Sequence, residues 1–406
     1  MQEIIIEKPY KFVPPHRGKA WPWIFQHFRI AQWYLNRFLG VVSYQLRGVE
    51  HLRESLRLGH GVMLTPNHPR YSDPMAMGWV AREAGTHLYA MASWHLFEQH
   101  WLQHWALRRM GGFSVYREGV DRQSIDTAIE MLASAERPLV VFPEGAVFRT
   151  NDHLHALLDG VAFMARTAAK KRAKETPAAK VVIHPVAIKY LFHGDLHNSI
   201  EPVLNWVERR LTWESPSHGS LLQRITRILN GLLSLKEIEH MGQAQTGDFA
   251  TRQQRLIDHL LNPIELRWIG MHQTGSIIPR IKAIRMKIMP ELVRGELSSV
   301  ERQQRWKDLS ALYLSQQIAS YPPAYLATPT TETRVLEMVE RIEEDLIDKA
   351  RIHRPLEAII EVGPAIEVST ERGPRGEEDP IMTTLRDNLQ SMLNRLAKEA
   401  KPFEDS

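Results

Sequence analysis

The chain has 406 residues, of which 43% are hydrophobic and 24% are charged. This is the balance of a folded globular protein, long enough for two domains or for one domain with a large insertion. The net charge of +4 is too small for a dedicated nucleic-acid binder, and the absence of cysteine excludes disulfides, thiolate metal sites and a cysteine nucleophile.

Hydropathy along the chain indicates no segment that crosses a membrane. No window reaches the roughly 18 uninterrupted apolar residues of a spanning helix, and the first residues lack the regions of a signal peptide. The sequence pI is near 9.1, a mild basic balance that suits an anionic membrane surface or a phosphorylated substrate. We therefore expect a cytoplasmic protein, peripheral on the inner face of the membrane.

Residues 1–40 form an N-terminal segment that is rich in large aromatic side chains. A helix over 21–39 would place Ile24, Phe28, Ala31, Leu35 and Phe38 on one side, although aromatic residues also occur around the rest of it. Two interpretations fit equally well: a helix lying in the lipid headgroup region, or a helix packed over the protein core.

Residues 41–199 alternate short apolar runs with stretches of helical pattern. Runs rich in Val, Ile and aromatic residues predict strands at 41–46, 61–66, 87–91, 113–116, 139–142 and 181–188. Helices are expected between them, around 74–84, 95–109, 121–135 and 157–174. This alternation predicts an α/β core with a mixed, largely parallel sheet flanked by helices.

Residues 200–354 are predicted to be a helical insertion, with helices at 219–237, 250–270, 276–295, 298–319 and 331–350 and no internal repeat. Residues 355–406 then return to the core with strands at 358–362 and 365–368 and a terminal helix. Its apolar stripe consists of Leu385, Leu389, Met392, Leu393 and Leu396. A separate C-terminal helical domain is the competing arrangement, but it leaves the two late strands without a sheet.

The most informative stretch is a junction between a strand and a helix that begins at Asn67. His68 lies in the expected loop, and Asp73 followed by Pro74 is typical of the start of a helix. A turn at Pro69 would bring the carboxylate to the imidazole, fix its tautomer and leave one ring nitrogen free as a general base. Alternatively, Asp73 only caps the helix. With nineteen histidines, about one His-x4-Asp pair is expected by chance.

Three further motifs follow in the chain. They are Gly111-Gly112-Phe113 with Arg117, then Phe142-Pro143-Glu144-Gly145 at the end of a strand, and a strand with Pro185 inside it. With Asn67, His68 and Asp73, this ordered set resembles the glycerolipid acyltransferases, the family of lysophosphatidate and glycerol-3-phosphate acyltransferases. Each motif alone is a weak signal, whereas four in the family's order are a strong one. The resemblance covers roughly 41–191 and 355–370 and leaves the insertion unexplained.

The resemblance implies a role for individual residues. His68 would be the general base and Asp73 its orienting partner, and the acceptor would be bound by Phe113, Arg117, Glu144 and Gly145, with Arg117 on its phosphate. The family's third motif usually continues Gly-Thr-Arg, whereas here the next arginine is Arg149, two residues later than usual. We expect Arg149 to replace it, a departure that concerns the identity of the acceptor. The alternative explanations of these positions are a surface arginine, an ion-paired glutamate and a glycine required by turn geometry.

The resemblance also implies the reaction. A fatty acyl group would pass from acyl-CoA or acyl-carrier protein to the hydroxyl of a glycerophosphate-type acceptor, foremost lysophosphatidate, in phospholipid synthesis at a membrane surface. No metal or prosthetic group is required, and backbone N–H groups near the helix that starts at Pro74 would stabilise the oxyanion.

Other functions stay open at this point. His153 with His155, or His193 with His197, could supply metal ligands, although scattered loop histidines are the commoner explanation. A metal-dependent phosphoesterase and a non-catalytic lipid-binding or scaffold protein on the same fold are therefore the two alternatives.

Overall fold

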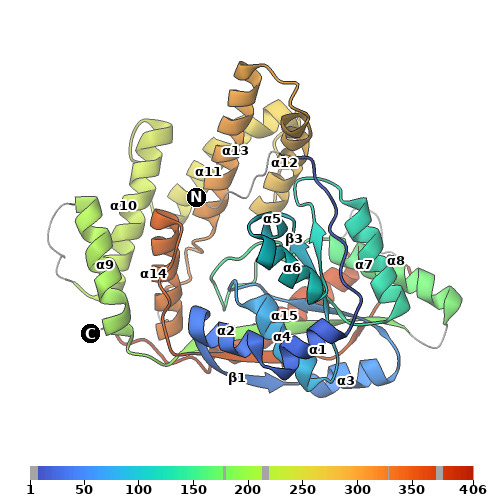
Figure 1. Cartoon of the computed structure of the whole chain (residues 1–406). Helices are drawn as coiled ribbons and strands as arrows, with labels where there is room; N and C mark the ends of the chain where they lie inside the picture. Colours follow the sequence, from blue (N-terminus) through green and yellow to red (C-terminus); the bar gives the residue numbers. More distant parts are fainter. Residues whose placement is uncertain (1–7, 177–179, 213–218, 328, 372–377, 406) are drawn as a thin grey trace. The chain divides into compact units, whose positions relative to one another are not determined.

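The computed structural model describes residues 8–176, 180–212, 219–327, 329–371 and 378–405, and Figure 1 traces the whole chain. Contacts between residues divide it into two compact units. The α/β unit consists of Tyr10–His193 and Ile352–Ala400, and the helical unit consists of Gly194–Arg351 with short segments from both chain ends. The helical unit is thus inserted, in the sequence, between two parts of the α/β unit.

The α/β unit is built on a mixed, mostly parallel sheet. Its strand order is β1-β7-β6-β2-β5-β3-β4, with β8 beside β6. The strands are β1 (Val41–Arg47), β2 (Gly61–Pro66), β3 (Tyr89–Ser93), β4 (Gly112–Val115), β5 (Leu139–Val140), β6 (Val181–Phe192), β7 (Leu356–Val362) and β8 (Ile366–Glu367). Paired strands are parallel, except that β6 is antiparallel to β7 and β8. The predicted fold class, α/β, is confirmed.

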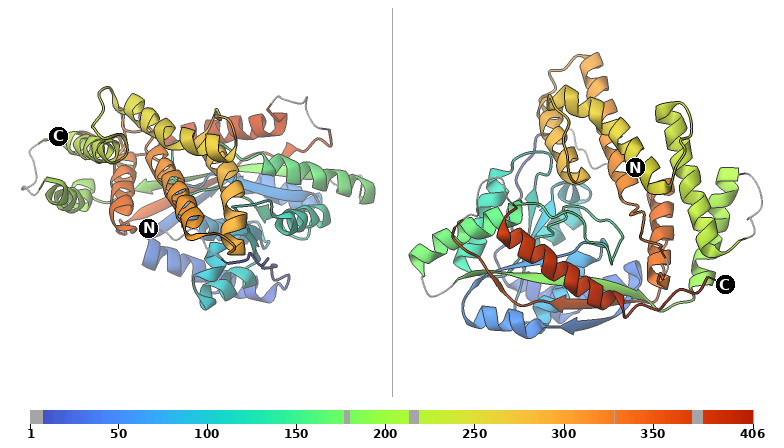
Figure 2. Two further views of the ribbon diagram at one scale, coloured as in Figure 1. Left: turned by 90° about the horizontal axis from the view of Figure 1, so that it is seen from above. Right: turned by 180° about the vertical axis from the view of Figure 1, so that it is seen from behind.

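Helices cover both faces of this sheet. The helices α7 (Arg122–Ser134), α8 (Gly160–Glu175) and α15 (Pro380–Ala397) share one apolar core with the strands, and α2 (Ile30–Leu39), α3 (Val49–Arg57) and α4 (Asp73–Glu83) lie on the opposite face. In Figure 2, the view from above shows α15 (red) and the first helices (dark blue) on opposite sides of the sheet. Because both faces are covered, every residue of β2 and β6 is buried, which explains their nearly continuous apolar sequences. The predicted stripe of the last helix is confirmed, since its five residues are all buried.

The aromatic N-terminal segment is two helices rather than one. α1 (Ala20–His27) ends at His27, and α2 begins after Arg29, whose φ of 50° lies in the left-handed region and breaks the helix. The prediction of one apolar side is therefore wrong: Leu35 is buried, whereas Phe28 is 66% exposed and Phe38 41%.

Two other helix predictions differ from the structure. The predicted helix 95–109 is divided into α5 (His95–Glu98) and α6 (Trp101–Arg109), because His100 is extended and its side chain caps α6 by accepting from the N–H of Leu102. The helix α9 (Leu196–Thr212) is not in the prediction, and Pro202 inside it interrupts the expected pattern.

The two late strands both join β6. β7 pairs with the second half of β6 and lies between β6 and β1, whereas β8 pairs with Val182 and Ile183 near its start. At the junction between the late strands, the N–H of Gly363 donates to the carbonyl of Pro185 at 2.8 Å. His184 is a buried core residue, whose ring nitrogens contact Ser55 Oγ at 2.9 Å and the Gly363 carbonyl at 2.8 Å.

The helical unit contains two groups of helices. One group comprises α9, α10 (Leu221–Met241) and α14 (Glu332–Ile347), and the other comprises α11 (Phe249–Trp268), α12 (Ile277–Arg294) and α13 (Ser299–Ala319). The second group has its own apolar core, and α10 contacts α11.

The helical unit carries an internal repeat, and our prediction that there is none is wrong. Gly219, Gly247 and Gly275 precede α10, α11 and α12 at intervals of 28 residues, and an arginine recurs at the same interval. Each arginine binds both carboxylate oxygens of a buried glutamate on the preceding helix. We call these contacts the Arg–Glu clamps: Arg224 with Glu208, Arg252 with Glu237, and Arg280 with Glu265.

The second and third clamps are completed by the backbone. The N–H of Gln245 donates to Glu237 at 2.9 Å, and the N–H of Gln273 donates to Glu265 at 3.0 Å. The carboxylates therefore hold a helix, the next helix and the loop between them. The repeated residues are few and polar, so the apolar periodicity on which we based the prediction does not contain them.

Candidate active site

The candidate site lies where β2 ends and α4 begins. β2 is fully buried and ends at Pro66, and α4 starts at Asp73 with Pro74 in its first turn. The side chain of Asn67 holds the intervening loop to β6, because it exchanges two hydrogen bonds with the backbone of Ile188 at 2.7 and 3.0 Å. The loop therefore starts from a fixed point at the edge of the core.

His68 and Asp73 are in direct contact, as their spacing and the turn predicted. His68 Nδ1 lies 2.8 Å from Asp73 Oδ2. Because a carboxylate only accepts hydrogen bonds, Nδ1 carries the hydrogen. The same oxygen accepts the N–H of Arg70 at 2.8 Å, and the carboxylate is fully buried. The tautomer and the orientation of the imidazole are thereby fixed.

The other ring nitrogen of His68 is available to a substrate. Nε2 has no hydrogen-bond partner within the described part of the chain, and the side chain is 14% exposed. The ring stacks on Phe142, with 4.0 Å between the centroids and 26° between the planes. A neutral imidazole in this arrangement can take a proton from a hydroxyl group at Nε2.

Glu144 holds the backbone of this site. Its two oxygens accept the N–H of His68 at 2.7 Å and the N–H of His155 at 3.0 Å, and its side chain is buried. Burial, with a smaller contribution from the charge of Asp73, raises its pKa to about 7, while the two N–H donors oppose the shift. Both oxygens thus bind backbone groups, and the contact of Glu144 with an acceptor hydroxyl stays a prediction.

Arg117 and Arg149 lie around the loop that follows β5. A guanidinium nitrogen of Arg117 donates to the carbonyl of Gly145, a neutral acceptor. Gly145 has a φ of 71°, which explains the glycine at this turn. The Arg149 guanidinium stands over the ring of Tyr71, at 5.5 Å, and the charge of Arg117 also acts on Tyr71. Tyr71 is in the His68 loop, so both arginines are near it.

Phe113 does not reach this site. It is fully buried in the core of the sheet and packs on Phe12, with 6.4 Å between the ring centroids. Its placement supports a packing role, and the family-based expectation that it contacts the acceptor finds no support in this geometry.

The expected oxyanion donors at the start of α4 are already bonded. Pro74 has no N–H, the N–H of Asp73 donates to the Arg70 carbonyl, and those of Met75 and Ala76 donate to the Ser72 carbonyl. These backbone groups are therefore not free for an oxyanion.

One of the two histidine pairs that could bind metal is brought together. The rings of His153 and His155 meet edge to face, with 4.6 Å between their centroids, and the ring of His155 also stacks on Phe148. In the other pair, His193 contacts Glu357 and His197 contacts Glu201. Burial lowers the pKa of His155 to about 3, so it is neutral. Among the described residues, no group of three or more His, Asp or Glu side chains is arranged to hold a metal ion.

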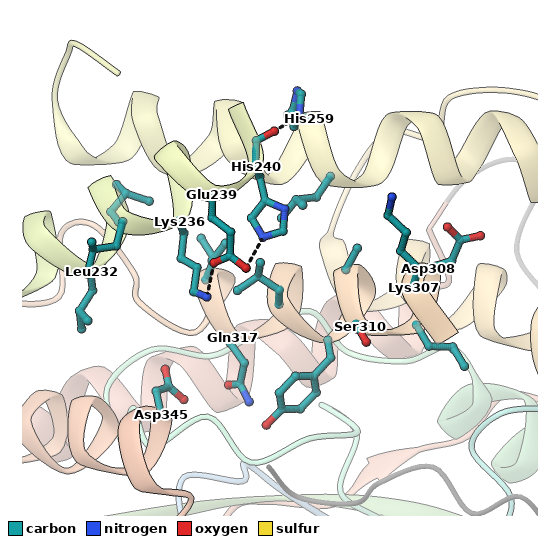
Figure 3. A pocket seen from close by; sticks show the side chains of 18 of the residues that line it. Leu232, Lys236, Glu239, His240, His259, Lys307, Asp308, Ser310, Gln317 and Asp345 are labelled. Atoms are coloured by element: carbon teal, nitrogen blue, oxygen red, sulfur yellow. Dashed lines mark hydrogen bonds and ion pairs between the residues drawn. The ribbon is translucent and has the colours of Figure 1, made fainter. Parts of the chain in front are cut away.

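A groove of about 1560 Å³ lies within the helical unit and was not predicted. Apolar and charged side chains line it together, and its leucines include Leu232 of α10, Leu260 of α11 and Leu309 of α13. Figure 3 shows Lys236, His240 and Lys307 among the side chains around it. Lys236 and His240 both contact Glu239, at 2.7 and 3.8 Å. The sequence contains no motif that marks this groove, because its walls come from helices far apart in the chain.

The structure thus combines a mixed α/β sheet with a hydrogen-bonded His–Asp pair at the end of a buried strand. Residues 44–189 match the model of the Acyltransferase family, the family of glycerolipid acyltransferases such as the lysophosphatidate acyltransferases. The match covers the segment that carries the four motifs, and the resemblance inferred from them is confirmed. A search of curated proteins finds no match. In the described residues, no helix combines the length and apolarity needed to span a bilayer.

Proposed function

We propose that the protein transfers a fatty acyl group from an acyl thioester, acyl-CoA or acyl-carrier protein, to the hydroxyl of a glycerophosphate-type acceptor, with lysophosphatidate as the foremost candidate. The observation that carries the proposal is the His68–Asp73 contact of 2.8 Å, which leaves Nε2 of His68 without a partner in the described part of the chain. The acyltransferase domain supports the reaction class.

The proposed reaction needs one base and no covalent enzyme intermediate. Nε2 of His68 removes the acceptor's hydroxyl proton while the hydroxyl oxygen attacks the thioester carbonyl carbon. The tetrahedral intermediate then collapses, the carbon–sulfur bond breaks, and the imidazolium returns the proton to the leaving thiolate. An ester and a thiol are the products. Asp73 stabilises the imidazolium that forms between the two steps.

Arg117 and Arg149 would bind the phosphate of the acceptor. A guanidinium matches a phosphate bidentately, and anchoring this group positions the hydroxyl for attack. The support is their placement beside Tyr71, in the loop that carries His68. The later position of Arg149 in the motif bears on the identity of the acceptor.

The substrates are lipids, so we also propose that the protein lies on the inner face of the membrane through α1 and α2. Trp23 is 54% exposed, Phe28 66% and Trp33 61%. Exposed aromatic residues with nearby arginines favour the headgroup region of a bilayer. We call the side chains of Trp23, Phe28, Trp33, Tyr34 and Phe38 the aromatic surface.

A matrix of donors and acceptors tests the proposal. Purified protein is incubated with labelled palmitoyl-CoA or palmitoyl-acyl-carrier protein, each with lysophosphatidate, glycerol-3-phosphate or lysophosphatidylcholine. We expect ester formation with the acceptors that carry a phosphate monoester and little with lysophosphatidylcholine. Equal transfer to all acceptors would contradict the phosphate assignment, and no transfer to any would contradict the proposed reaction.

A further inference from the structure

Asp73 has a third hydrogen-bond donor that no motif contains. The hydroxyl of Tyr190, on β6, donates to Asp73 Oδ1 at 2.6 Å. This is the carboxylate oxygen opposite the one that binds His68 and the N–H of Arg70. Tyr190 and Asp73 are both fully buried. The imidazole, the carboxylate and the phenol therefore form a continuous chain of hydrogen bonds that begins at the surface and ends in the core.

The position of the phenol is itself fixed. Ser72 Oγ donates to the Tyr190 hydroxyl at 2.7 Å. The Asn151 side chain exchanges two hydrogen bonds with the backbone of Tyr190, each of 3.1 Å, just as Asn67 does with Ile188. Beyond the end of β2, the side-chain amides of Asn67 and Asn151 thus form the hydrogen bonds to the backbone of β6 that a paired strand would form. Burial and the charge of Asp73 raise the pKa of Tyr190 well above its usual value, so its hydroxyl stays a donor.

We propose that Tyr190 is a positioning residue that sets the orientation and the proton affinity of His68 through Asp73. A hydrogen bond to Oδ1 stabilises the negative charge on the carboxylate and weakens its attraction for a proton on His68. The imidazolium that forms during the reaction then releases its captured proton more readily. This inference rests on the proposed function, because it takes His68 as the catalytic base.

Other charged groups lie near this chain of hydrogen bonds, and a test must leave them unchanged. The Glu144 carboxylate follows β5 and acts electrostatically on Asp73, and the Arg70 guanidinium lies 5.4 Å from the Tyr190 ring centroid. The charge of Arg70 also acts on Tyr190. Removing this one hydroxyl with Tyr190→Phe is therefore the smallest change that breaks the chain.

The test measures the pKa of His68 by NMR, in the full chain, with the signal assigned by its absence in His68→Ala. We expect Tyr190→Phe to raise this pKa by about one unit, because the carboxylate loses a donor and binds the imidazolium more tightly. The acid limb of the kcat/KM profile should move upward in pH by the same amount, and kcat should fall about tenfold to a hundredfold.

Tyr89→Phe is the matched control, because Tyr89 is a fully buried tyrosine on β3, remote from Asp73 in the hydrogen-bond network. It should leave the pKa of His68 unchanged. Ser72→Ala provides a second, milder variant, expected to shift the pKa in the same direction by less, and it carries the test if Tyr190→Phe does not fold.

The outcomes separate the inference from the proposed function. An unchanged pKa in Tyr190→Phe, or a shift as large in Tyr89→Phe, would overturn the inference even if the wild-type protein transfers acyl groups. A shifted pKa in a protein without transfer activity would support the coupling of Tyr190 to His68 and contradict the proposed function instead.

Discussion

Two buried carboxylates hold His68 from different sides. Asp73 binds the ring at Nδ1, and Glu144 binds the backbone N–H at 2.7 Å. The first fixes the tautomer, and the second ties the loop of His68 to the turn that follows β5. Phe142, from the same segment as Glu144, stacks on the ring. The base is thus held by its ring, its face and its backbone, which is the pre-organisation that a general base requires.

Arg117 is predicted to act on binding rather than on chemistry. Arg117→Ala should raise the KM for a phosphate-bearing acceptor about tenfold to a hundredfold and change kcat little, because the lost contacts are charge-assisted hydrogen bonds to the phosphate. Steady-state kinetics with varied acceptor measure this. Arg122→Ala, an exposed arginine on α7, is the control. An unchanged KM in Arg117→Ala would count against the phosphate assignment.

Glu144 is predicted to make stability depend on pH. Its pKa is about 7 in the folded protein against an ordinary 4.5, so the folded state binds the proton more tightly. The free energy of unfolding should therefore fall as pH rises from about 4.5 to 7, by at most about 3 kcal/mol relative to Glu144→Gln. Urea unfolding of both proteins across this range is the measurement. Parallel pH profiles would show that burial does not raise the pKa.

Among the residues of the site, the sequence predicts His68 and Asp73 more readily than the side chains that position them. The spacing of His68 and Asp73 predicts their contact, because five residues and a turn determine it. Tyr190 is 117 residues from Asp73, and only strand pairing brings it there. Similarly, the sequence favours Glu144 as an acceptor contact, but burial and two N–H donors at its carboxylate give it a structural role. The sequence does not show that Phe113 is fully buried, and a role for it in acceptor binding stays a prediction.

At the scale of helices, the Arg–Glu clamps connect consecutive helices of the helical unit. Each joins consecutive helices through a buried, bidentate contact, and the loop N–H groups of Gln245 and Gln273 satisfy the remaining acceptor capacity of two carboxylates. A buried ion pair adds little compared with apolar packing, but the loss of one partner leaves a buried charge without compensation. The clamps therefore determine which helix follows which more than they add net stability.

The middle clamp is predicted to be sensitive to the loss of one partner. Arg252→Ala should destabilise the helical unit by about 3–5 kcal/mol, because Glu237 remains buried and charged. The double variant Arg252→Met with Glu237→Leu should recover much of this loss. Lys236→Ala, which removes an exposed contact with Glu239, is the control and should cost less than about 1 kcal/mol. Urea unfolding compares them, and equal effects of Arg252→Ala and Lys236→Ala would contradict this account.

The aromatic surface of α1 and α2 is predicted to bind lipid. Trp33→Ala combined with Phe28→Ala should weaken sedimentation with anionic phosphatidylserine-containing vesicles about tenfold or more, since large exposed rings are lost. The control is Leu58→Ala, because Leu58 is 47% exposed after α3. If the variant binds vesicles as the wild type does, this surface is not the membrane contact.

Periodicity predicts most helices and strands of the protein, and local geometry explains the exceptions. β2 and the stripe of α15 were predicted correctly because each is apolar in a regular pattern. The left-handed Arg29 and the extended His100 interrupt helices without a glycine or proline to mark the break. The sequence pattern does not predict the repeat of the helical unit, because the repeat consists of glycines and ion pairs rather than apolar positions.

For the whole molecule, the order of the strands shows which parts of the chain the sheet requires. β7 is encoded after the helical unit but lies between β1 and β6, so the sheet is complete only when the last part of the chain is present. At the start of the insertion, the N–H of His193 donates to the carbonyl of Pro355 at 3.1 Å. The two ends of the inserted segment are therefore neighbours in the α/β unit. The sequence pattern predicts an α/β part and a helical part of the chain. It does not predict this strand order, which depends on pairing between strands that are far apart in the sequence.

Transfer of labelled palmitoyl-CoA to lysophosphatidate by the wild-type protein, His68→Ala and His153→Ala tests the central claim most directly. His153 is an exposed histidine in the same unit and serves as the control. The account predicts ester formation by the wild type and by His153→Ala, and a rate at least a hundredfold lower in His68→Ala with an unchanged circular dichroism spectrum. Transfer by His68→Ala at the wild-type rate would show that His68 is not the base and that the site lies elsewhere.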